Sequence, residues 1–236
     1  MSKTKIEQLT EFGQSAWLDS ISRAMIETGK LKEMIRQGLR GVTSNPTIFD
    51  KAISSGDDYD QKTKELSNDG KSVFEIYDEL TVRDIQDAAD IFMPVYQETQ
   101  GLDGYVSLEI NPKLAFKTRE TIEEGKRLYK KVNRVNVMFK VPATEDGFKA
   151  IEELIACGIN INVTLIFALG QYINAAQAYI RGIKRILQNN GDASQVRSVA
   201  SIFVSRIDTA VDNLLEEKII KEKDQEKKIQ LSSLKG

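Results

Sequence analysis

The chain has 236 residues, of which 41% are hydrophobic and 29% are charged, with a formal net charge of −2. This length and composition suit one α/β domain with a sizeable core, and the charge balance excludes the strongly basic surface of a nucleic-acid-binding protein. The absence of histidine excludes a Ser-His-Asp triad and a His-ligated zinc or iron site, so acid–base chemistry falls to carboxylates, lysine, tyrosine or water.

Six short apolar runs predict buried parallel strands, with helical patterns between them. In chain order, the predicted strands lie at residues 15–22, 39–45, 104–110, 135–142, 158–167 and 197–205. Helices are predicted at residues 111–132, 146–158 and 168–191, and a glycine closes the second and the third of them. This alternation is typical of βαβ units that build a parallel sheet.

The interval between the second and third predicted strands, about residues 46–103, is longer than one crossover helix requires. Residues 72–99 in this insertion carry the pattern of two extra helices. Beyond Asp208 the chain is very polar, and the charge run at 217–228 fits a helix, with no further strand after it. We therefore predict one domain over residues 1–236 with six strands, two fewer than a closed (β/α)8 TIM barrel contains.

Three features of the sequence bear on its compartment. Residues 1–14 contain no apolar run typical of a secretory signal. The longest apolar stretch, residues 161–170, is too short and too polar to span a bilayer. The single cysteine, Cys157, excludes an internal disulfide and fits a reducing compartment. We therefore expect a cytoplasmic protein with no membrane partner.

Polar residues lie near the C-terminal end of each predicted strand. In a parallel α/β barrel these ends converge on one face, where active sites are built. The sequence therefore gathers carboxylate, amide, hydroxyl and amine groups at one end of the sheet, from Asp19, Thr43, Asn45, Glu109, Lys140, Asn162, Thr164, Ser201 and Arg206.

Most of these residues also have a purely structural interpretation. A lysine at a strand end, such as Lys140, can reach solvent through its long stem. Asp19 can cap a helix, Arg206 can form a surface ion pair, and Asn45 precedes Pro46 in a common turn sequence. Their coincidence at six strand ends favours a site over separate structural explanations.

Lys140 lies within the apolar run at 137–141. A lysine forms a Schiff base with a carbonyl carbon only as the free amine, and its ordinary pKa of about 10.4 keeps it protonated at neutral pH. Apolar surroundings disfavour the charged form and lower the pKa of such a lysine. The iminium then accepts electrons when an adjacent C–C bond is cleaved, and Asp19 and Glu109 are the candidates that move the protons.

Two segments resemble the signature sequences of transaldolases, namely residues 41–49 (GVTSNPTIF) and residues 137–151 (VMFKVPATEDGFKAI). Four further segments resemble the family in the same order, at residues 17–23, 106–112, 161–167 and 201–208. The resemblance runs from about residue 10 to about residue 210 and is similar to the longer bacterial branch of the family.

This resemblance implies a class I transferase of the pentose phosphate pathway that needs no cofactor and no metal. It would move a dihydroxyacetone unit from sedoheptulose 7-phosphate to glyceraldehyde 3-phosphate through a lysine Schiff base. We expect small sugar phosphates as its partners, and a monomer or homodimer. A fructose 6-phosphate-type class I aldolase and a non-catalytic barrel remnant are the alternatives.

The resemblance also implies a role for each site residue. Lys140 forms the Schiff base, Asp19 moves the proton of the hydroxyl next to the broken bond, and Glu109 with Thr164 holds the water that forms and hydrolyses the imine. The other residues are implied to bind the substrate. Asn45 and Asn162 bind hydroxyls of the donor, and Ser201 and Arg206 bind the sugar phosphate. Phe203 lines the pocket, and Thr43 has a supporting role.

The resemblance departs from the family at the C-terminal end. No segment here matches the seventh and eighth strands of the family, or the second phosphate-binding arginine that follows the seventh strand. We therefore expect a barrel that is incomplete at this end, with strand edges left unpaired.

Overall fold

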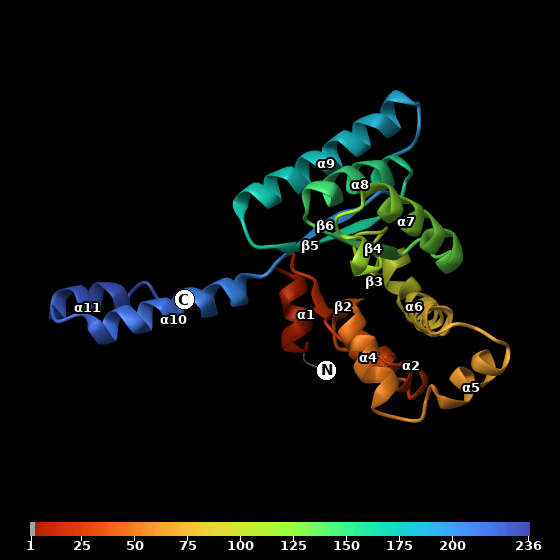
Figure 1. Cartoon of the computed structure of the whole chain (residues 1–236), viewed down its shortest axis with the longest axis horizontal. Coiled ribbons are helices and arrows are strands. Elements are labelled where there is room, and N and C mark those ends of the chain that lie inside the picture. Colours follow the sequence, from red (N-terminus) through yellow and green to blue (C-terminus); the bar gives the residue numbers. More distant parts are fainter. Residues whose placement is uncertain (1–2) are drawn as a thin grey trace.

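A computed structural model describes residues 3–236 as a parallel sheet flanked by helices (Figure 1). Neighbouring strands pair in chain order, so a crossover segment joins each strand to the next. The strands are β1 (Ala16–Leu18), β2 (Leu39–Thr43), β3 (Tyr105–Glu109), β4 (Val137–Pro142), β5 (Ile161–Ile166) and β6 (Ser198–Ile202). The six predicted strands and their parallel arrangement are confirmed, and the sheet is curled into half of a TIM-like barrel.

Helices fill the crossovers and the two ends of the described chain. They are α1 (Lys5–Thr10), α2 (Arg23–Glu27), α3 (Lys30–Arg36), α4 (Pro46–Ser54), α5 (Asp60–Asn68), α6 (Val73–Glu98), the 3-10 turn η1 (Pro112–Leu114), α7 (Thr118–Val132), α8 (Glu145–Ala156), α9 (Leu169–Gln188), α10 (Val204–Lys221) and α11 (Gln225–Ser232). Three of them, α7, α8 and α9, confirm the helices predicted between the later strands. The helices α10 and α11 project away from the sheet (Figure 1). Within residues 3–236, none of the helices has the length and apolar character that crossing a bilayer requires.

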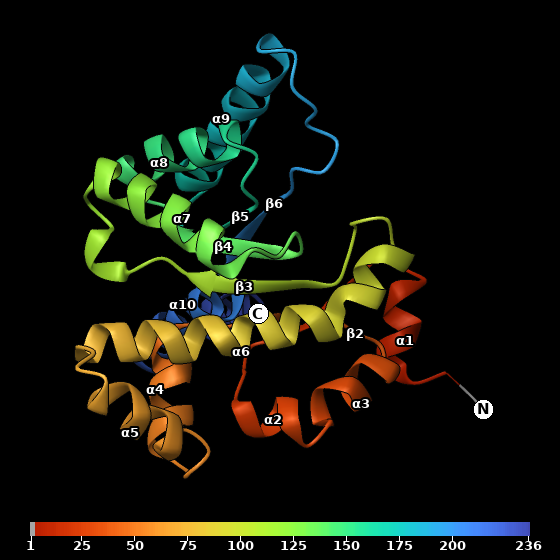
Figure 2. The same ribbon diagram turned by 90° about the vertical axis from the view of Figure 1, so that its right-hand side faces the viewer.

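The insertion between β2 and β3 differs in one respect from the prediction. Residues 72–99 were expected to form two helices, but the structure has one helix of 26 residues there, α6 (Figure 2). Its interior contains Pro94, which removes one backbone hydrogen bond and disfavours a continuous helix. A buried face that includes Ile85 and Phe92 runs along the helix, and its packing offsets that local cost.

The two outer strands are shorter than predicted. After β1, the chain turns at Ser22, whose hydroxyl accepts a hydrogen bond from the Met25 amide at 3.3 Å and caps α2. After β6, α10 begins at Val204, so residues 203–205 leave the sheet. Within the described residues, β1 and β6 each pair with one neighbour only.

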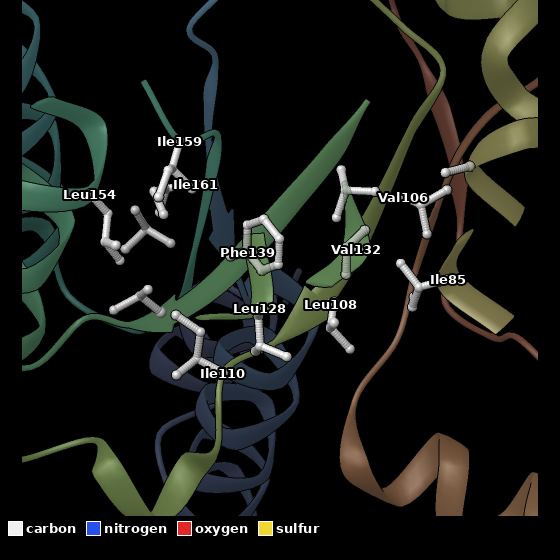
Figure 3. Close-up of a cluster of buried hydrophobic side chains, with 14 of the residues drawn as sticks. Ile85, Val106, Leu108, Ile110, Leu128, Val132, Phe139, Leu154, Ile159 and Ile161 are labelled. Atoms are coloured by element: carbon white, nitrogen blue, oxygen red, sulfur yellow. The ribbon is translucent and has the colours of Figure 1, made fainter. Parts of the chain in front are cut away.

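The main core lies between the sheet and the helices that cover it (Figure 3). Phe139 of β4 is fully buried there, among side chains such as Leu108 of β3 and Leu128 of α7. Strands β3 and β4 are buried over almost their whole length, which explains why the sequence shows continuous apolar runs. Each large side chain buried in this way contributes about 2 kcal/mol to stability.

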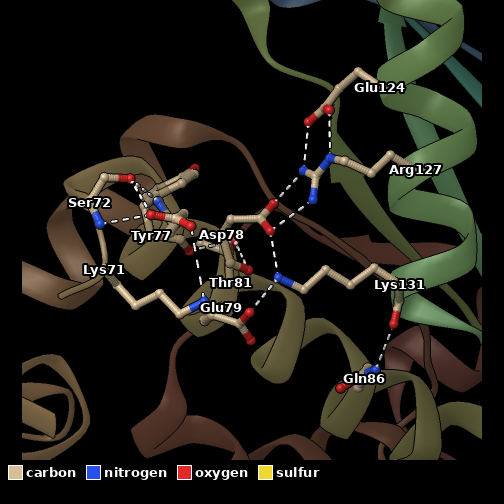
Figure 4. A network of polar contacts seen from close by, with 11 residues as sticks. Lys71, Ser72, Tyr77, Asp78, Glu79, Thr81, Gln86, Glu124, Arg127 and Lys131 are labelled. Carbon is tan, nitrogen blue, oxygen red and sulfur yellow. Dashed lines mark hydrogen bonds and ion pairs between the residues drawn. The ribbon is translucent and has the colours of Figure 1, made fainter. Parts of the chain in front are cut away.

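A polar network joins α6 to α7 at the rim of this core (Figure 4). Both oxygens of the Asp78 carboxylate accept hydrogen bonds from Arg127, at 2.6 and 3.0 Å, and Lys131 donates a further bond at 2.6 Å. Burial alone raises the pKa of Asp78, but the hydrogen bonds from Arg127 and Lys131 outweigh it and hold the pKa below its ordinary value. The carboxylate therefore stays charged and fixes the two helices together.

A second network ties the segment after β1 to α6. Asp84 of α6 is buried and accepts hydrogen bonds from the Arg23 guanidinium at 2.8 and 3.0 Å and from the Tyr59 hydroxyl at 2.6 Å. The Tyr59 hydroxyl in turn accepts a hydrogen bond from the Arg23 backbone amide at 2.9 Å. Because Arg23 begins α2, this network holds the turn that leads out of β1.

We expect Asp84→Ala to lower the free energy of unfolding by about 3 kcal/mol, because it leaves the Arg23 guanidinium buried without its carboxylate. Urea denaturation followed by circular dichroism measures this loss. The matched control is Asp90→Ala, which breaks the more exposed pair between Arg134 and Asp90 and should cost less than about 1 kcal/mol. Equal losses in the two variants would contradict the structural role assigned to Asp84.

Candidate active site

A pocket of about 670 Å³ opens at the C-terminal ends of the strands. Its walls come from β2 with α4, from β3, β4 and β5, and from the junction of β6 with α10. The pocket brings together the predicted site residues Asp19, Thr43, Asn45, Glu109, Lys140, Thr164, Ser201, Phe203 and Arg206. Asn162 is the one predicted residue that does not line it.

The pairing of parallel strands explains why these side chains meet. Glu109 of β3 is paired with Lys140 of β4, and Lys140 is paired with Asn162 of β5. Residues paired in register on neighbouring strands point to the same face of the sheet. The carboxylate, the amine and the amide therefore lie at one level of the curled sheet, on the face that bounds the pocket.

Lys140 reaches the pocket with a largely buried side chain and is 9% exposed. Its Nζ donates a hydrogen bond to the Ser44 carbonyl at 2.8 Å and lies 3.7 Å from Oε2 of Glu109. Burial raises the pKa of the Glu109 carboxyl, against the lowering effect of Lys140. A carboxyl group with a raised pKa next to an amine is suited to moving protons to and from that amine.

Ser44 holds the Lys140 amine and was missed in the sequence analysis. Its amide and its hydroxyl both donate to the Ser107 carbonyl, at 3.2 and 2.7 Å, which fixes the turn after β2 against β3. Its own carbonyl is then available to Lys140. The contact joins residues 96 positions apart, so no local pattern could have revealed it.

Asn162 does not line the pocket and is only 3% exposed. Its Oδ1 accepts a hydrogen bond from the Ser201 hydroxyl at 2.7 Å, and its Nδ2 donates to the Ser107 hydroxyl at 3.2 Å. Both ends of the side-chain amide are therefore engaged within the protein. In this arrangement Asn162 orients Ser201, which itself lines the pocket.

Thr43 ends β2 and Asn45 precedes α4, and the two side chains differ in their hydrogen bonds. Asn45 is the N-cap of α4, and its Oδ1 accepts a hydrogen bond from the Ile48 amide at 2.9 Å, so part of its structural interpretation holds. The Thr43 hydroxyl oxygen is buried and has no hydrogen-bond partner among residues 3–236. A buried hydroxyl without a hydrogen-bond partner costs free energy.

Arg206 lines the pocket from the first turn of α10. Its guanidinium carbon is 4.6 Å from the centroid of the Phe203 ring, and Phe203 stacks on Phe167 with centroids 5.2 Å apart. The side chain is exposed and forms no ion pair within the described chain. The two stacked rings therefore support a cation whose donors are available to an anion.

The pocket also contains residues that the sequence analysis did not select. Lys51 of α4 lines it together with Thr47 and Ile48, which are the neighbours expected on one face of a helix. Leu165 of β5 lines it with a φ of +59°, where the pairing of β5 with β6 shifts register. The helical spacing from Thr47 and Ile48 could have indicated Lys51. Nothing in the sequence indicated Leu165, because leucine rarely adopts a left-handed backbone conformation.

Comparison with known proteins agrees with this geometry. The family model described as transaldolase/fructose-6-phosphate aldolase matches residues 16–234. A protein named transaldolase from Trichodesmium erythraeum is 47% identical over 230 residues, covering 97% of this chain and 60% of that protein. A protein named transaldolase 2 from Nostoc sp. is 44% identical over 220 residues, covering 93% of this chain and 58% of that protein.

A transaldolase from Arthrobacter sp. is 46% identical over 214 residues, covering 90% of this chain and 58% of that protein. The chain thus spans about 60% of the length of these curated relatives. The match of the family model over most of the chain, and these identities, lead to one conclusion. The chain belongs to the transaldolase/fructose-6-phosphate aldolase family.

Proposed function

We propose that this chain carries the Schiff-base site of a transaldolase, a transferase of the non-oxidative pentose phosphate pathway. It transfers a dihydroxyacetone unit from sedoheptulose 7-phosphate to glyceraldehyde 3-phosphate. The single observation behind this proposal is the buried Lys140 amine, which lies in the pocket at 3.7 Å from the Glu109 carboxylate. The names of the relatives, all of which are transaldolases, support the same reaction.

In the first half of the reaction, Lys140 gives up a proton and its Nζ attacks the carbonyl carbon of the donor ketose. The adduct loses water, to which Glu109 supplies a proton, and becomes the iminium. Asp19 then takes the proton of the hydroxyl next to the breaking C–C bond. The bond electrons move into the iminium, an enamine remains on Lys140, and the aldehyde product leaves.

In the second half, the enamine carbon attacks the acceptor aldehyde and Asp19 returns its proton to the new hydroxyl. Water held by Glu109 and Thr164 then adds to the iminium, with Glu109 taking a proton. Collapse of this adduct releases the new ketose and restores the Lys140 amine. A raised pKa suits Glu109 to both steps, because the group must donate a proton in one and accept a proton in the other.

The substrate follows the pocket from the lysine to the arginine. Asn45 binds a donor hydroxyl near Lys140, and Ser201 and Arg206 bind the phosphate. Phe203 lines the pocket, and Thr43 has a supporting role. The exposed Arg206 guanidinium forms no ion pair within residues 3–236, and this supports its role. Asn162, first expected on a donor hydroxyl, acts through Ser201, because its own amide is already bonded.

A class I aldolase that releases free dihydroxyacetone would use the same groups. The family description includes fructose-6-phosphate aldolase, but the relatives named above favour transfer. Measuring whether carbon–carbon cleavage requires an aldehyde acceptor separates the two reactions.

The test is reduction with borohydride in the presence of fructose 6-phosphate, followed by peptide mass spectrometry. A Schiff base would be reduced to a stable secondary amine on the peptide that contains Lys140. An unmodified Lys140 in a sample that is folded by circular dichroism would refute the proposal and would favour a non-catalytic chain.

We further infer that residues 1–236 act as one domain in the cytoplasm, as a monomer or homodimer with sugar phosphates as its ligands. The single continuous sheet supports one domain, and the lone exposed Cys157 fits a reducing compartment. Light scattering during size-exclusion chromatography measures the assembly.

A further inference from the structure

Gln171, in the first turn of α9, forms hydrogen bonds with three backbone groups near the pocket. Its Nε2 donates to the Ala143 carbonyl at 2.9 Å and to the Leu165 carbonyl at 3.4 Å, and its Oε1 accepts from the Phe167 amide at 2.9 Å. Ala143 directly follows β4, the strand of Lys140, whereas Leu165 lies in β5, the strand of Thr164. One side chain therefore connects the ends of two strands that build the site.

The conformation of Leu165 needs such support. Its φ of +59° is uncommon for any residue except glycine, and it costs free energy that the surroundings must offset. Leu165 nevertheless lines the pocket and is 45% exposed, so its own side-chain packing offers limited support. The bond from Gln171 to its carbonyl is a contact that holds this backbone in place.

The third bond leads toward the phosphate end of the pocket. Gln171 holds the amide of Phe167, and the Phe167 ring stacks on Phe203 at 5.2 Å with an interplanar angle of 17°. The Arg206 guanidinium lies against the same Phe203 ring, at 4.6 Å from its centroid. A displacement of the Phe167 backbone would therefore remove the support of the arginine.

We propose that Gln171 is a positioning residue for the phosphate end of the pocket. It fixes the segment between β5 and α9, so that Leu165 forms the pocket wall and Phe167 supports Phe203 and Arg206. The proposal rests on the proposed function, since it assumes that Arg206 binds the substrate phosphate. A role confined to the start of α9 would require only the bond to Phe167, whereas Gln171 also binds Ala143, the residue that follows β4.

The test compares Gln171→Ala with Gln86→Ala in the full chain. Gln86 is the matched control, because its Nε2 also donates to two backbone carbonyls, those of Lys131 and Val132 at 3.1 and 3.2 Å, but it joins α6 to α7 away from the pocket. The readout is the donor concentration that gives half-maximal borohydride trapping, measured with fructose 6-phosphate and with fructose. The value for fructose 6-phosphate divided by the value for fructose isolates the contribution of the phosphate.

In Gln171→Ala we expect half-maximal trapping to need about 10-fold more fructose 6-phosphate, and less than about 2-fold more fructose. Gln86→Ala should change neither value. Gln171→Glu keeps an acceptor for the Phe167 amide but removes the N–H donors of Nε2. It should therefore also need more fructose 6-phosphate than the unaltered chain, with little change for fructose. The same weakening with both sugars, or the same change in Gln86→Ala, would overturn the assignment to the phosphate end.

A second measurement does not depend on the Schiff-base chemistry. Hydrogen–deuterium exchange in the peptide that covers residues 165–168, without any ligand, should be faster in Gln171→Ala than in the unaltered chain, and unchanged in Gln86→Ala. Unchanged exchange in Gln171→Ala would overturn the positioning role. If the unaltered chain traps neither sugar, the proposed function and the link to phosphate both fail, and exchange alone decides whether Gln171 holds the segment.

Discussion

Replacing Lys140 by methionine should abolish the borohydride-trapped adduct with fructose 6-phosphate. Methionine has a similar length and suits a side chain that is 9% exposed, but it has no amine to attack a carbonyl. The loss should be complete, because in the proposed mechanism no other group of the pocket acts as the nucleophile. Peptide mass spectrometry of the reduced sample measures the adduct, and circular dichroism establishes that the variant is folded.

Two comparisons make this result specific. Lys149→Met removes an exposed lysine of α8 that lies outside the pocket, and it should leave the adduct on Lys140 unchanged. Lys51 is the other lysine that lines the pocket. If Lys140→Met still carried an adduct, on Lys51 or elsewhere, the role assigned to Lys140 would be wrong.

Glu109→Gln should slow the appearance of the trapped adduct by about 10²–10⁴-fold, which is the usual range for removing a general acid or base. Glutamine keeps the shape of the side chain, but its amide cannot act as a general acid or a general base. Adding borohydride at increasing times after mixing with fructose 6-phosphate measures the rate of adduct formation. Glu120→Gln, in the exposed first turn of α7, is the control and should react as the unaltered chain does.

The pH dependence gives an independent check on Glu109. Burial raises the pKa of this carboxyl, against the effect of Lys140, so it becomes protonated at a higher pH than an ordinary glutamate. The carboxylate is the form that takes a proton during hydrolysis of the iminium. The hydrolysis rate should therefore fall as the pH falls through this raised pKa. In Glu109→Gln this decrease should be absent. An identical pH profile in the variant would show that another group acts as the base.

The parallel topology explains why much of the site was predictable from the sequence. Strands buried on both faces have continuous apolar runs, so even a single polar residue such as Lys140 or Glu109 is conspicuous in them. Once the strands are parallel, their C-terminal ends lie on one side, and residues distant in the chain meet there. No distance had to be known to expect Lys140, Glu109 and Thr164 in one pocket.

The sequence by itself thus determined the six strands, their parallel order and most of the residues of the pocket, because strand burial and strand direction follow from local patterns of side chains. Only the tertiary structure decided that residues 72–99 form one helix, that Asn162 bonds to Ser201 without lining the pocket, and that Gln171 bonds to Leu165 and Phe167. These outcomes depend on packing along a buried face, on hydrogen bonds between separate strands and on a backbone conformation that leucine rarely adopts. The hydrogen bonds between distant segments and the positive φ of Leu165 leave no periodic signal in the chain. The helical period of residues 72–99 is visible, but it does not decide between one helix and two.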